Sequence, residues 1–468
     1  MSLAKRPCPF PPPGVAALGH PGISSQILTM GPRDSLTGYP ERPMLLDLLA
    51  RPNLRHQQRR GLRTALLVLD LSRFRGVNDA LGHELGDRLL VSLTERVEAQ
   101  LPTDSTLARL GGGCLAVLLE GLLDSNRASR VANRIHTELT KPFHLAGNEI
   151  FVNISMGLAL NQGSEDRPEN LLRDAETALY HAKNSGSHLE IFRPSLRFEA
   201  VARFQLENEL RQALERRQFR LAFQPIFSLP QRRLVGFEAL LRWQHPRRGT
   251  LCPREFLPIA IEMGLISPID QWVLTEACRQ LASWRQQSSH GDQIWVSTNL
   301  TAPEILDSTL PVRVEQALGR QGLEARDLKL ELTEWARLEP SPQVKGAIRR
   351  LRERGIGILV DDFGTGYSCL SYLHYIPGEA LKIDRSFIAG LGVSKIQTQV
   401  VASIVRLAQE LDMVVVAEGV ETVDQLQQLE ALGCHRAQGF LLGVPLSSEA
   451  VSDFLRGQTV TPPMQTRT

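Results

Sequence analysis

Residues 356–362 read Ile-Gly-Ile-Leu-Val-Asp-Asp, a short apolar run that ends in two neighbouring carboxylates. A run of this length that stops at polar residues is typical of a buried β-strand. Seven similar runs occur in the second half of the chain, at 221–223, 234–241, 295–300, 328–332, 380–383, 414–417 and 437–441. Eight runs over about 250 residues, with helical stretches between most of them, predict an α/β fold with a C-terminal TIM-like (β/α)8 barrel.

The first two runs, 221–223 and 234–241, lie close together in the sequence. We expect them to pair as a hairpin, which would make the barrel irregular at this point. An open, doubly wound sheet is the alternative architecture for the same alternation of strands and helices. A charged helix predicted at 198–216 precedes the first run, so we expect the barrel domain to cover 198–468.

Polar side chains occur at the ends of these runs. They are Glu238, Asn299, Glu331, Glu334, Asp361, Asp362, Lys382, Asp384, Glu418, Glu421 and Gln438. A single Asp or Asn after a strand is compatible with an ordinary helix N-cap, and a single Lys with an exposed surface position. As a series, however, they concentrate carboxylates on one face of the barrel, which is costly unless cations neutralise them. Oxygen ligands without His or Cys favour Mg²⁺ or Mn²⁺.

Two such cations a few ångströms apart can activate a water molecule and stabilise the leaving oxygen of a phosphodiester. The neighbouring carboxylates Asp361 and Asp362 can contribute to two cations at once. Arg242, four residues after Glu238, offers a guanidinium that can hold a phosphate group. The residues alone therefore indicate metal-assisted phosphoester chemistry and leave the substrate open.

The overall composition supports a globular protein of two or three domains. The chain has 468 residues, 42 % hydrophobic and 22 % charged, with a net charge of only +2. This charge gives no large basic field, so we expect no nucleic-acid polymer as a partner. No apolar stretch is long enough for a membrane span. The six cysteines form no C-x-x-C pair, which favours reduced thiols and a cytoplasmic location.

The first half of the chain reads as a tail and a separate α+β domain. Residues 1–28 are rich in proline and glycine, so we expect a disordered tail. Strands are predicted at 65–71, 106–110, 115–119 and 150–160, with a helix at 169–184. Three glycines, 111–113, lie between two of these strands and indicate a tight hairpin. We therefore expect a domain over 29–197.

The second half resembles the EAL domains, bacterial phosphodiesterases specific for cyclic di-GMP. The signature is similar to residues 238–243, Glu-Ala-Leu-Leu-Arg-Trp, and the family's mobile active-site loop is similar to 361–368, Asp-Asp-Phe-Gly-Thr-Gly-Tyr-Ser. Further matches follow in order at 224–226, 255–258, 381–384, 418–421 and 438–440. Some 250 residues carry this resemblance. It implies hydrolysis of cyclic di-GMP to linear pGpG with two Mg²⁺ or Mn²⁺ ions per active site.

The resemblance also implies a role for each matching position. The first metal ion would be held by Glu238, Asn299, Glu331 and Asp361, and the second by Asp361, Asp362 and Glu418. Lys382 would orient the attacking water or stabilise the developing charge, Glu418 would share the role of base, and Glu334 would brace the active-site loop. The dinucleotide would be contacted by Gln224, Leu240, Arg242, Asp384, Glu421 and Gln438. A homodimer is expected by resemblance alone.

The first domain resembles a GGDEF domain, the cyclic di-GMP synthase that is often fused upstream. Residues 34–38 are similar to its entry motif and 178–183 to its last helix. The decisive hairpin departs from the family, because its acidic pair is replaced by Gly113 and Cys114, and Ser72 replaces a second metal-binding acid. Cys114 is a poor ligand for a hard cation. We therefore predict a degenerate domain without cyclase activity.

Part of the nucleotide site persists in this domain, at Asp70, Asn78 and Asp87. Two interpretations are open: these residues act as local caps and turns, or the domain binds GTP without converting it and stimulates the barrel. For the barrel, the alternatives to an active hydrolase are a receptor that binds cyclic di-GMP without cleaving it and signals through a protein partner, and a scaffold in which both domains have lost their chemistry. The complete acidic series favours the enzyme.

Overall fold

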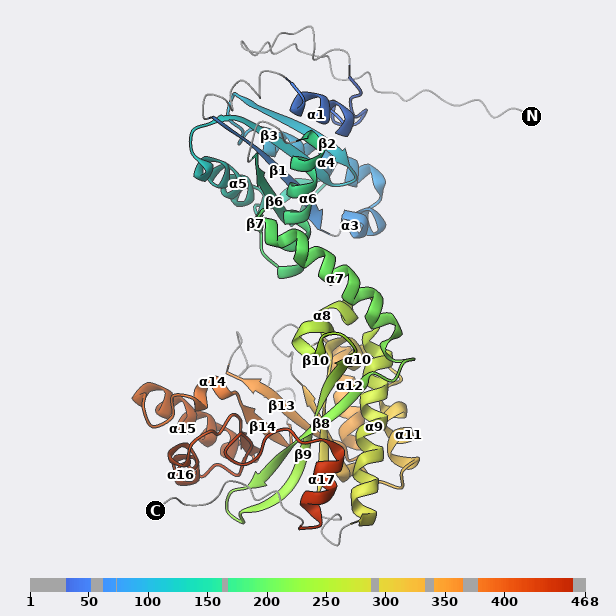
Figure 1. Cartoon of the computed structure of the whole chain (residues 1–468), viewed down its shortest axis with the longest axis vertical. Helices are drawn as coiled ribbons and strands as arrows, with labels where there is room; N and C mark the ends of the chain where they lie inside the picture. The colour runs from blue at the N-terminus through green and yellow to red at the C-terminus, as the bar shows by residue number, and fades with distance from the viewer. Residues whose placement is uncertain are drawn as a thin grey trace, which may run out of the picture. The chain divides into compact units, whose positions relative to one another are not determined.

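The chain forms two compact units, Met1–Phe204 and Gln205–Thr468. The structure is a computed structural model that describes residues 31–51, 62–72, 74–161, 167–287, 294–332, 341–364 and 378–457 (Figure 1). The predicted tail, 1–28, and Glu334 lie outside the described residues. The helix predicted at 198–216 is α7 (Pro194–Ala213), and the boundary between the units falls within it.

The first unit is built on a five-stranded sheet with the strand order β2-β3-β1-β6-β7. Its strands are β1 (Arg63–Ser72), β2 (Ser105–Gly111), β3 (Cys114–Leu122), β6 (Asn153–Leu160) and β7 (Leu189–Ile191). Only β6 and β7 are parallel, and the other neighbours are antiparallel. The central strand β1 is apolar and buried from Ala65 to Leu69, because helices cover both faces of the sheet.

Leu67 on one face of β1 packs in a cluster with α4 (His83–Glu98) and α5 (Ser125–Leu139). Leu66 on the other face packs with α1 (Arg42–Leu49) and α6 (Pro168–Ser185). The predicted strand 150–160 is two elements, since β5 (Asn148–Ile150) pairs with β4 (Phe143–Leu145) and β6 starts afterwards. This break places Phe151, which is 68 % exposed, outside the core.

The second unit contains a closed barrel with an irregular start, as the two adjacent apolar runs predicted. Its strands are β8 (Phe219–Ser228), β9 (Arg233–His245), β11 (Trp295–Leu300), β12 (Leu328–Leu332), β13 (Gly357–Phe363), β14 (Ala380–Ile383), β15 (Val414–Ala417) and β16 (Arg436–Ala437). Of these strands, the seven from β9 to β16 are parallel, whereas β8 is antiparallel to both β9 and β16 and closes the barrel between them. The alternative of an open sheet is therefore wrong. A short strand, β10 (Gly249–Leu251), pairs antiparallel with the end of β9.

The last predicted run, 437–441, is mostly not a strand. Only Arg436–Ala437 pairs as β16, and the chain then turns against the segment after β15. Gly439 adopts a φ of 158°, and a Cβ there would meet the backbone of Val420 at 2.1 Å. The backbone of Val420 hydrogen-bonds Gln438 and Leu441, so these residues cross the end of the barrel instead of extending its wall.

Helices lie outside the barrel (Figure 1). They are α8 (Pro253–Glu262), α9 (Ile266–Gln287), α10 (Ala302–Leu306), α11 (Leu310–Gly319), α12 (Pro342–Glu353), α14 (Arg385–Ile388), α15 (Lys395–Glu410), α16 (Val423–Ala431) and α17 (Ser448–Leu455). None of the helices in the described part of the chain is long and apolar enough to cross a membrane.

An apolar floor closes the amino-terminal end of the barrel. Trp295 packs there with Ile226, Val235, Leu359 and other buried side chains. Gly236 makes room for it, because a Cβ at that position would lie 2.5 Å from the indole ring. The acidic residues at the carboxyl ends of the strands therefore lie above an apolar layer, at the end where barrels of this kind hold their active sites.

Candidate functional site

Lys382 is the centre of the polar cluster in the barrel. It comes from β14 and its side chain is fully buried. Its Nζ lies 2.5 Å from Glu331 Oε2, 2.6 Å from Glu418 Oε1, 3.2 Å from Glu238 Oε2 and 3.3 Å from Asp361 Oδ1. Four acids that are up to 180 residues apart in the sequence therefore converge on one ammonium group.

Two amide side chains join the same cluster from β11 and from the end of β16. Asn299 donates from Nδ2 to Glu238 Oε1 at 3.3 Å. Gln438 donates from Nε2 to Glu238 Oε2 at 2.7 Å and to Glu418 Oε1 at 3.2 Å. These hydrogen bonds leave the amide oxygens of both residues buried and without a partner among the described residues.

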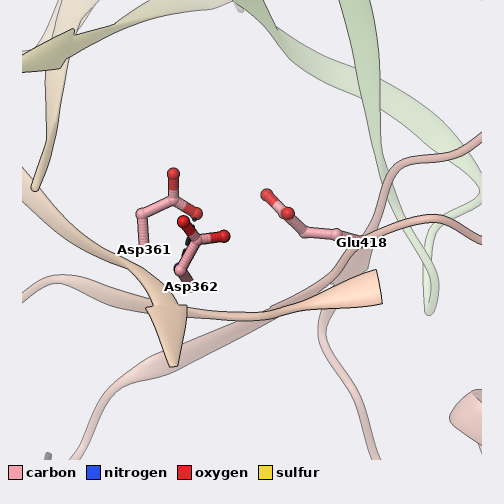
Figure 2. A group of neighbouring side chains, drawn as sticks. All are labelled: Asp361, Asp362 and Glu418. Atoms are coloured by element: carbon pink, nitrogen blue, oxygen red, sulfur yellow. Dashed lines mark hydrogen bonds between the residues drawn. The ribbon is translucent and has the colours of Figure 1, made fainter. Parts of the chain in front are cut away.

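A second group of carboxylates faces the opening of the barrel. Figure 2 shows Asp361 and Asp362 from β13 opposite Glu418, which follows β15. Each offers one carboxylate oxygen, and these oxygens lie within 4.8 Å of one another. Asp362 has a positive φ of 52°, a conformation that Asp tolerates better than most residues. The local backbone thus orients two successive carboxylates toward one space.

Burial and mutual repulsion raise the pKa of several of these acids. Burial, followed by the charge of Glu238, raises the pKa of Glu331 to about 8. Burial and the charge of Asp361 raise the pKa of Asp362 to about 6. Burial opposes a charge on Lys382, but the surrounding carboxylates, Asp361 foremost, raise its pKa well above the ordinary value. One ammonium is therefore too little positive charge for this cluster.

The residues fit a pair of divalent cations. Five carboxylates against one ammonium leave four negative charges when all are ionised, which is the charge that two divalent cations neutralise. Asn299 Oδ1 and Glu331 Oε1 are buried and without a hydrogen-bond partner among the described residues, so they are available as ligands. All donors are oxygens, as Mg²⁺ and Mn²⁺ prefer.

The residues expected to contact substrate lie partly on the same inner face. Gln224 of β8 is directly opposite Glu238 of β9, so the two side chains leave the sheet on one face. Leu240 and Arg242 follow Glu238 at intervals of two and share that face. All three are partly exposed, and Arg242 donates from Nη1 to the carbonyl of Leu241 at 2.8 Å. They line the rim above the acids.

Asp384 and Glu421 are less closely connected with the cluster. Asp384 caps α14 and accepts a hydrogen bond from the backbone of Ser386 at 2.9 Å, the local role that any such Asp can have. Glu421 is exposed. A residue that the sequence reasoning missed is Gln425, which is buried and accepts from the backbone N–H of Glu421 and Thr422. The signal was present as a Thr-x-x-Gln capping box at 422–425.

In the first unit, the predicted metal-binding Asp70 faces the degenerate hairpin. It is the register partner of Cys114 across β1 and β3. Burial, with the charge of Asp70, raises the pKa of Cys114 to about 12, so the thiol stays neutral. Lys183 of α6 lies 2.5 Å from Asp70 Oδ2. One carboxylate is thus matched by one ammonium.

Asn78 and Asp87 lie on the neighbouring helices α3 (Phe74–Leu81) and α4. The amide oxygen of Asn78 is buried and has no hydrogen-bond partner among the described residues. Gly86 is needed beside it, because a Cβ there would lie 1.8 Å from that oxygen. Asp87 is exposed. The two residues remain available to a ligand, and their role remains a prediction.

Comparison with known proteins assigns both halves of the chain. Residues 207–445 match the EAL domain, and residues 32–188 match the diguanylate cyclase, GGDEF domain. The chain is 39 % identical over 426 residues to the bifunctional diguanylate cyclase/cyclic di-GMP phosphodiesterase MucR of Pseudomonas aeruginosa, covering 91 % of this chain and 62 % of MucR. It is 36 % identical over 433 residues to the cyclic di-GMP phosphodiesterase NbdA of the same organism, covering 92 % of this chain and 55 % of NbdA.

A solved structure described as the PaMucR phosphodiesterase in complex with c-di-GMP is 43 % identical and has a TM-score of 0.50. It covers 53 % of this chain and 99 % of the solved one. The chain spans somewhat more than half the length of the curated relatives named above. The domain matches, the identity with these relatives and the closed barrel agree, and the chain belongs to the family of tandem GGDEF–EAL proteins.

Proposed function

We propose that the EAL unit hydrolyses cyclic di-GMP to linear pGpG. The observation that carries this proposal is the complete acidic cluster around the buried Lys382, with an excess of negative charge at the carboxyl ends of the barrel strands. The names of MucR and NbdA and the c-di-GMP complex of a 43 % identical domain support the choice of substrate.

Two Mg²⁺ or Mn²⁺ ions would be held by the oxygen ligands described above. The first would be held by Glu238, Asn299, Glu331 and Asp361, and the second by Asp361, Asp362 and Glu418. When bound, such a pair lowers the pKa of a water molecule and stabilises negative charge on the oxygens of the phosphodiester. The amide of Gln438, which bridges Glu238 and Glu418, holds these two acids in register.

The remaining chemistry belongs to protein side chains. Lys382 carries a positive charge at the centre of the cluster, and it would orient the attacking water or stabilise the charge that develops on the phosphate. Glu418, whose Oε1 lies 2.6 Å from Lys382 Nζ, accepts the proton that the water loses. Arg242 at the rim would hold a phosphate, and Gln224 and Leu240 would contact the dinucleotide. In this proposal Glu334 braces the loop that begins at Asp361, and Asp384 and Glu421 contact the dinucleotide.

The proposal is tested with the purified chain, cyclic di-GMP and Mg²⁺ or Mn²⁺. We expect pGpG as the product and a loss of turnover of at least about 100-fold in Glu238→Ala, since this removes a metal ligand that also anchors Asn299. Glu255→Gln, in the capping box of α8, is a control outside the site. Full activity of Glu238→Ala would refute the metal assignment. Binding without cleavage by the wild type would favour the receptor alternative.

The GGDEF unit, in this proposal, has no cyclase activity. The salt bridge between Asp70 and Lys183 and the neutral thiol of Cys114 support this, because no excess negative charge is left to attract a cation. The unpartnered Asn78 oxygen favours a second proposal, that GTP binds this unit and stimulates the barrel. The phosphodiesterase rate with and without GTP tests it. We also propose a homodimer and a cytoplasmic location.

A further inference from the structure

A buried pair of acids lies behind the strand end that carries Asn299. Asp270 comes from α9 and Glu304 from α10, and they are only 9 % and 4 % exposed. Their carboxyl groups hydrogen-bond each other. Neither is a member of the acidic cluster around Lys382, and the proposed chemistry does not use them. Buried acids of this kind need a structural or functional reason, because their burial is costly.

Both acids hold the same residue, Thr301. The hydroxyl of Thr301 donates to Asp270 Oδ2 at 2.9 Å. The backbone of Thr301 also hydrogen-bonds the carboxyl group of Glu304. As a result Thr301, the N-cap of α10, makes no side-chain cap of its own helix. The segment is thus fixed by its side chain and by its main chain at the same point.

This point lies two residues after Asn299. The strand β11 ends at Leu300, and α10 begins at Ala302, so Thr301 sets the direction in which the chain leaves the barrel. Asn299 Nδ2 reaches Glu238 Oε1 at 3.3 Å, while its Oδ1 is buried and unpartnered among the described residues. A metal site loses affinity when one of its ligands moves by more than about half an ångström, or rotates by more than about 10–20°, from the productive geometry.

One proton between the carboxyl groups of Asp270 and Glu304 keeps the two buried acids in contact. Two buried carboxylates in contact cannot both be ionised. Arg313 of α11 is the cation that contacts the pair, and it is divided between Glu304 at 3.4 Å and Asp307 at 3.1 Å. Burial, followed by the charge of Asp270, raises the pKa of Glu304 to about 9, and burial raises the pKa of Asp270 to about 6. Near neutral pH, Glu304 therefore keeps its proton and donates a hydrogen bond to the carboxylate of Asp270.

We propose that Asp270 and Glu304 are positioning residues for the metal centre, because through Thr301 they fix the strand end that aims Asn299 at Glu238. The inference rests on the proposed function only in taking Asn299 as a metal ligand. It adds a neutral acid, Glu304, whose role is to donate a hydrogen bond. Supports of this kind typically change metal affinity by about 10–100-fold when they are removed.

The test measures Mn²⁺ binding to the full chain by calorimetry, without any nucleotide. We expect Thr301→Val, which removes the hydroxyl at nearly constant volume, and Glu304→Ala to raise the dissociation constant by about tenfold. Thr301→Ser keeps the hydroxyl and is expected to bind like the wild type. Glu304→Gln should also bind like the wild type, because its amide donates to Asp270 and its oxygen accepts from Thr301.

A second measurement separates positioning from general stability. With Mg²⁺ as the probe between pH 7.5 and 9.5, the affinity of the wild type should fall relative to that of Glu304→Gln. The wild type loses the proton of Glu304 in this range and the variant cannot, whereas the titration of Glu331 is common to both proteins. Wild-type affinity in both Thr301→Val and Glu304→Ala would overturn the inference, as would Glu304→Gln binding as weakly as Glu304→Ala, or a wild type that binds no Mn²⁺. A wild type that binds Mn²⁺ normally but does not cleave cyclic di-GMP would overturn the proposed function alone.

Discussion

Each unit of the chain places a lysine beside acids on its sheet, and the two sites differ in how the charges balance. In the barrel, Lys382 is fully buried and lies within 3.3 Å of four carboxylates. In the GGDEF unit, Lys183 is 41 % exposed and pairs with Asp70. The first site keeps a strong demand for further positive charge, whereas the second is neutral.

The difference in charge balance follows from two positions in the hairpin of the GGDEF unit, where the acidic pair of the family signature is absent. The position opposite Asp70 is Cys114, whose thiol stays neutral, and the preceding position is Gly113. A side chain at Gly113 would meet Leu71, because a Cβ there would lie 2.9 Å from the Cβ of Leu71. The packing around Gly113 therefore leaves no room for a side chain unless Leu71 moves. The two sites therefore differ in excess negative charge, and on this ground we expect the barrel site, and not the GGDEF site, to attract divalent cations.

The largest expected effect is that of Lys382→Met. This change leaves the surrounding carboxylates without their ammonium, and removing one member of a buried ion network typically costs about 3–5 kcal/mol. We expect the free energy of unfolding of the metal-free barrel to fall by this amount, and saturating Mg²⁺ to restore part of it. All five tryptophans lie in the second unit, so denaturant unfolding followed by tryptophan fluorescence reports on the barrel.

Lys183→Met is the matched control for Lys382→Met. Its salt bridge with Asp70 is partly exposed to solvent, and pairs of that kind contribute about 0–1 kcal/mol. Unfolding of this variant is followed by circular dichroism, because the first unit contains no tryptophan. Equal losses of stability in the two variants would show that Lys382 interacts with its carboxylates no more strongly than Lys183 interacts with Asp70.

The next effect concerns pH in the absence of metal. The pKa of Glu331 is raised to about 8 and that of Asp362 to about 6, so both bind protons in the folded state where the unfolded chain is ionised. Stability is therefore expected to fall as the pH rises toward these values, by up to about 1.4 kcal/mol per pH unit for each proton. Saturating Mg²⁺ takes the place of the protons and should flatten the dependence.

The measurement compares urea midpoints of the tryptophan signal at pH 6 and pH 8, with EDTA and with Mg²⁺. Binding of Mg²⁺ at pH 7 should release about one proton per chain, seen as a binding heat that varies with the ionisation enthalpy of the buffer. Equal midpoints at both pH values in EDTA would contradict the raised pKa of Glu331.

The smallest effect is expected from Cys114→Glu. It places a second carboxylate opposite Asp70 and gives the GGDEF site one uncompensated negative charge. We expect one additional, weak Mn²⁺ site per chain, with a dissociation constant on the order of a millimolar, and still no cyclase activity, because Gly113 and Ser72 remain. Calorimetry compares the stoichiometry with that of the wild type. Synthesis of cyclic di-GMP by this variant would show that Cys114 alone disables the site.

Much of the barrel was predictable because its pattern is local. Each apolar run stops at a polar residue, and the carboxyl ends of parallel strands meet on one face, so the sequence is enough to assign Asn299 and Asp361 to one site. The strand predicted at 437–441 was too long, because close packing of Gly439 on Val420 ends the strand after Ala437. The roles assigned to Asp384 and Glu421 remain predictions.

The residues that support the site were not predictable. Asp270 and Thr301 are 31 positions apart, and they meet only because α9 packs against the end of β11. Apolar periodicity places α9 on the barrel but does not specify which of its polar residues is buried. Similarly, the sequence contains Asp70 and Lys183 without indicating that they pair, since that contact depends on how α6 lies across the sheet.

The sequence by itself determined that eight apolar runs form a barrel, which oxygen-bearing residues gather at its carboxyl end, and that the hairpin with Cys114 has lost its acids. These follow from the order of residues along single strands. Only the tertiary structure decided that the reversed strand β8 closes the barrel, that Lys382 lies among four carboxylates, and that Lys183 neutralises Asp70. Those outcomes depend on distances between distant segments, and it is these distances that set the electrostatic energies of the two sites.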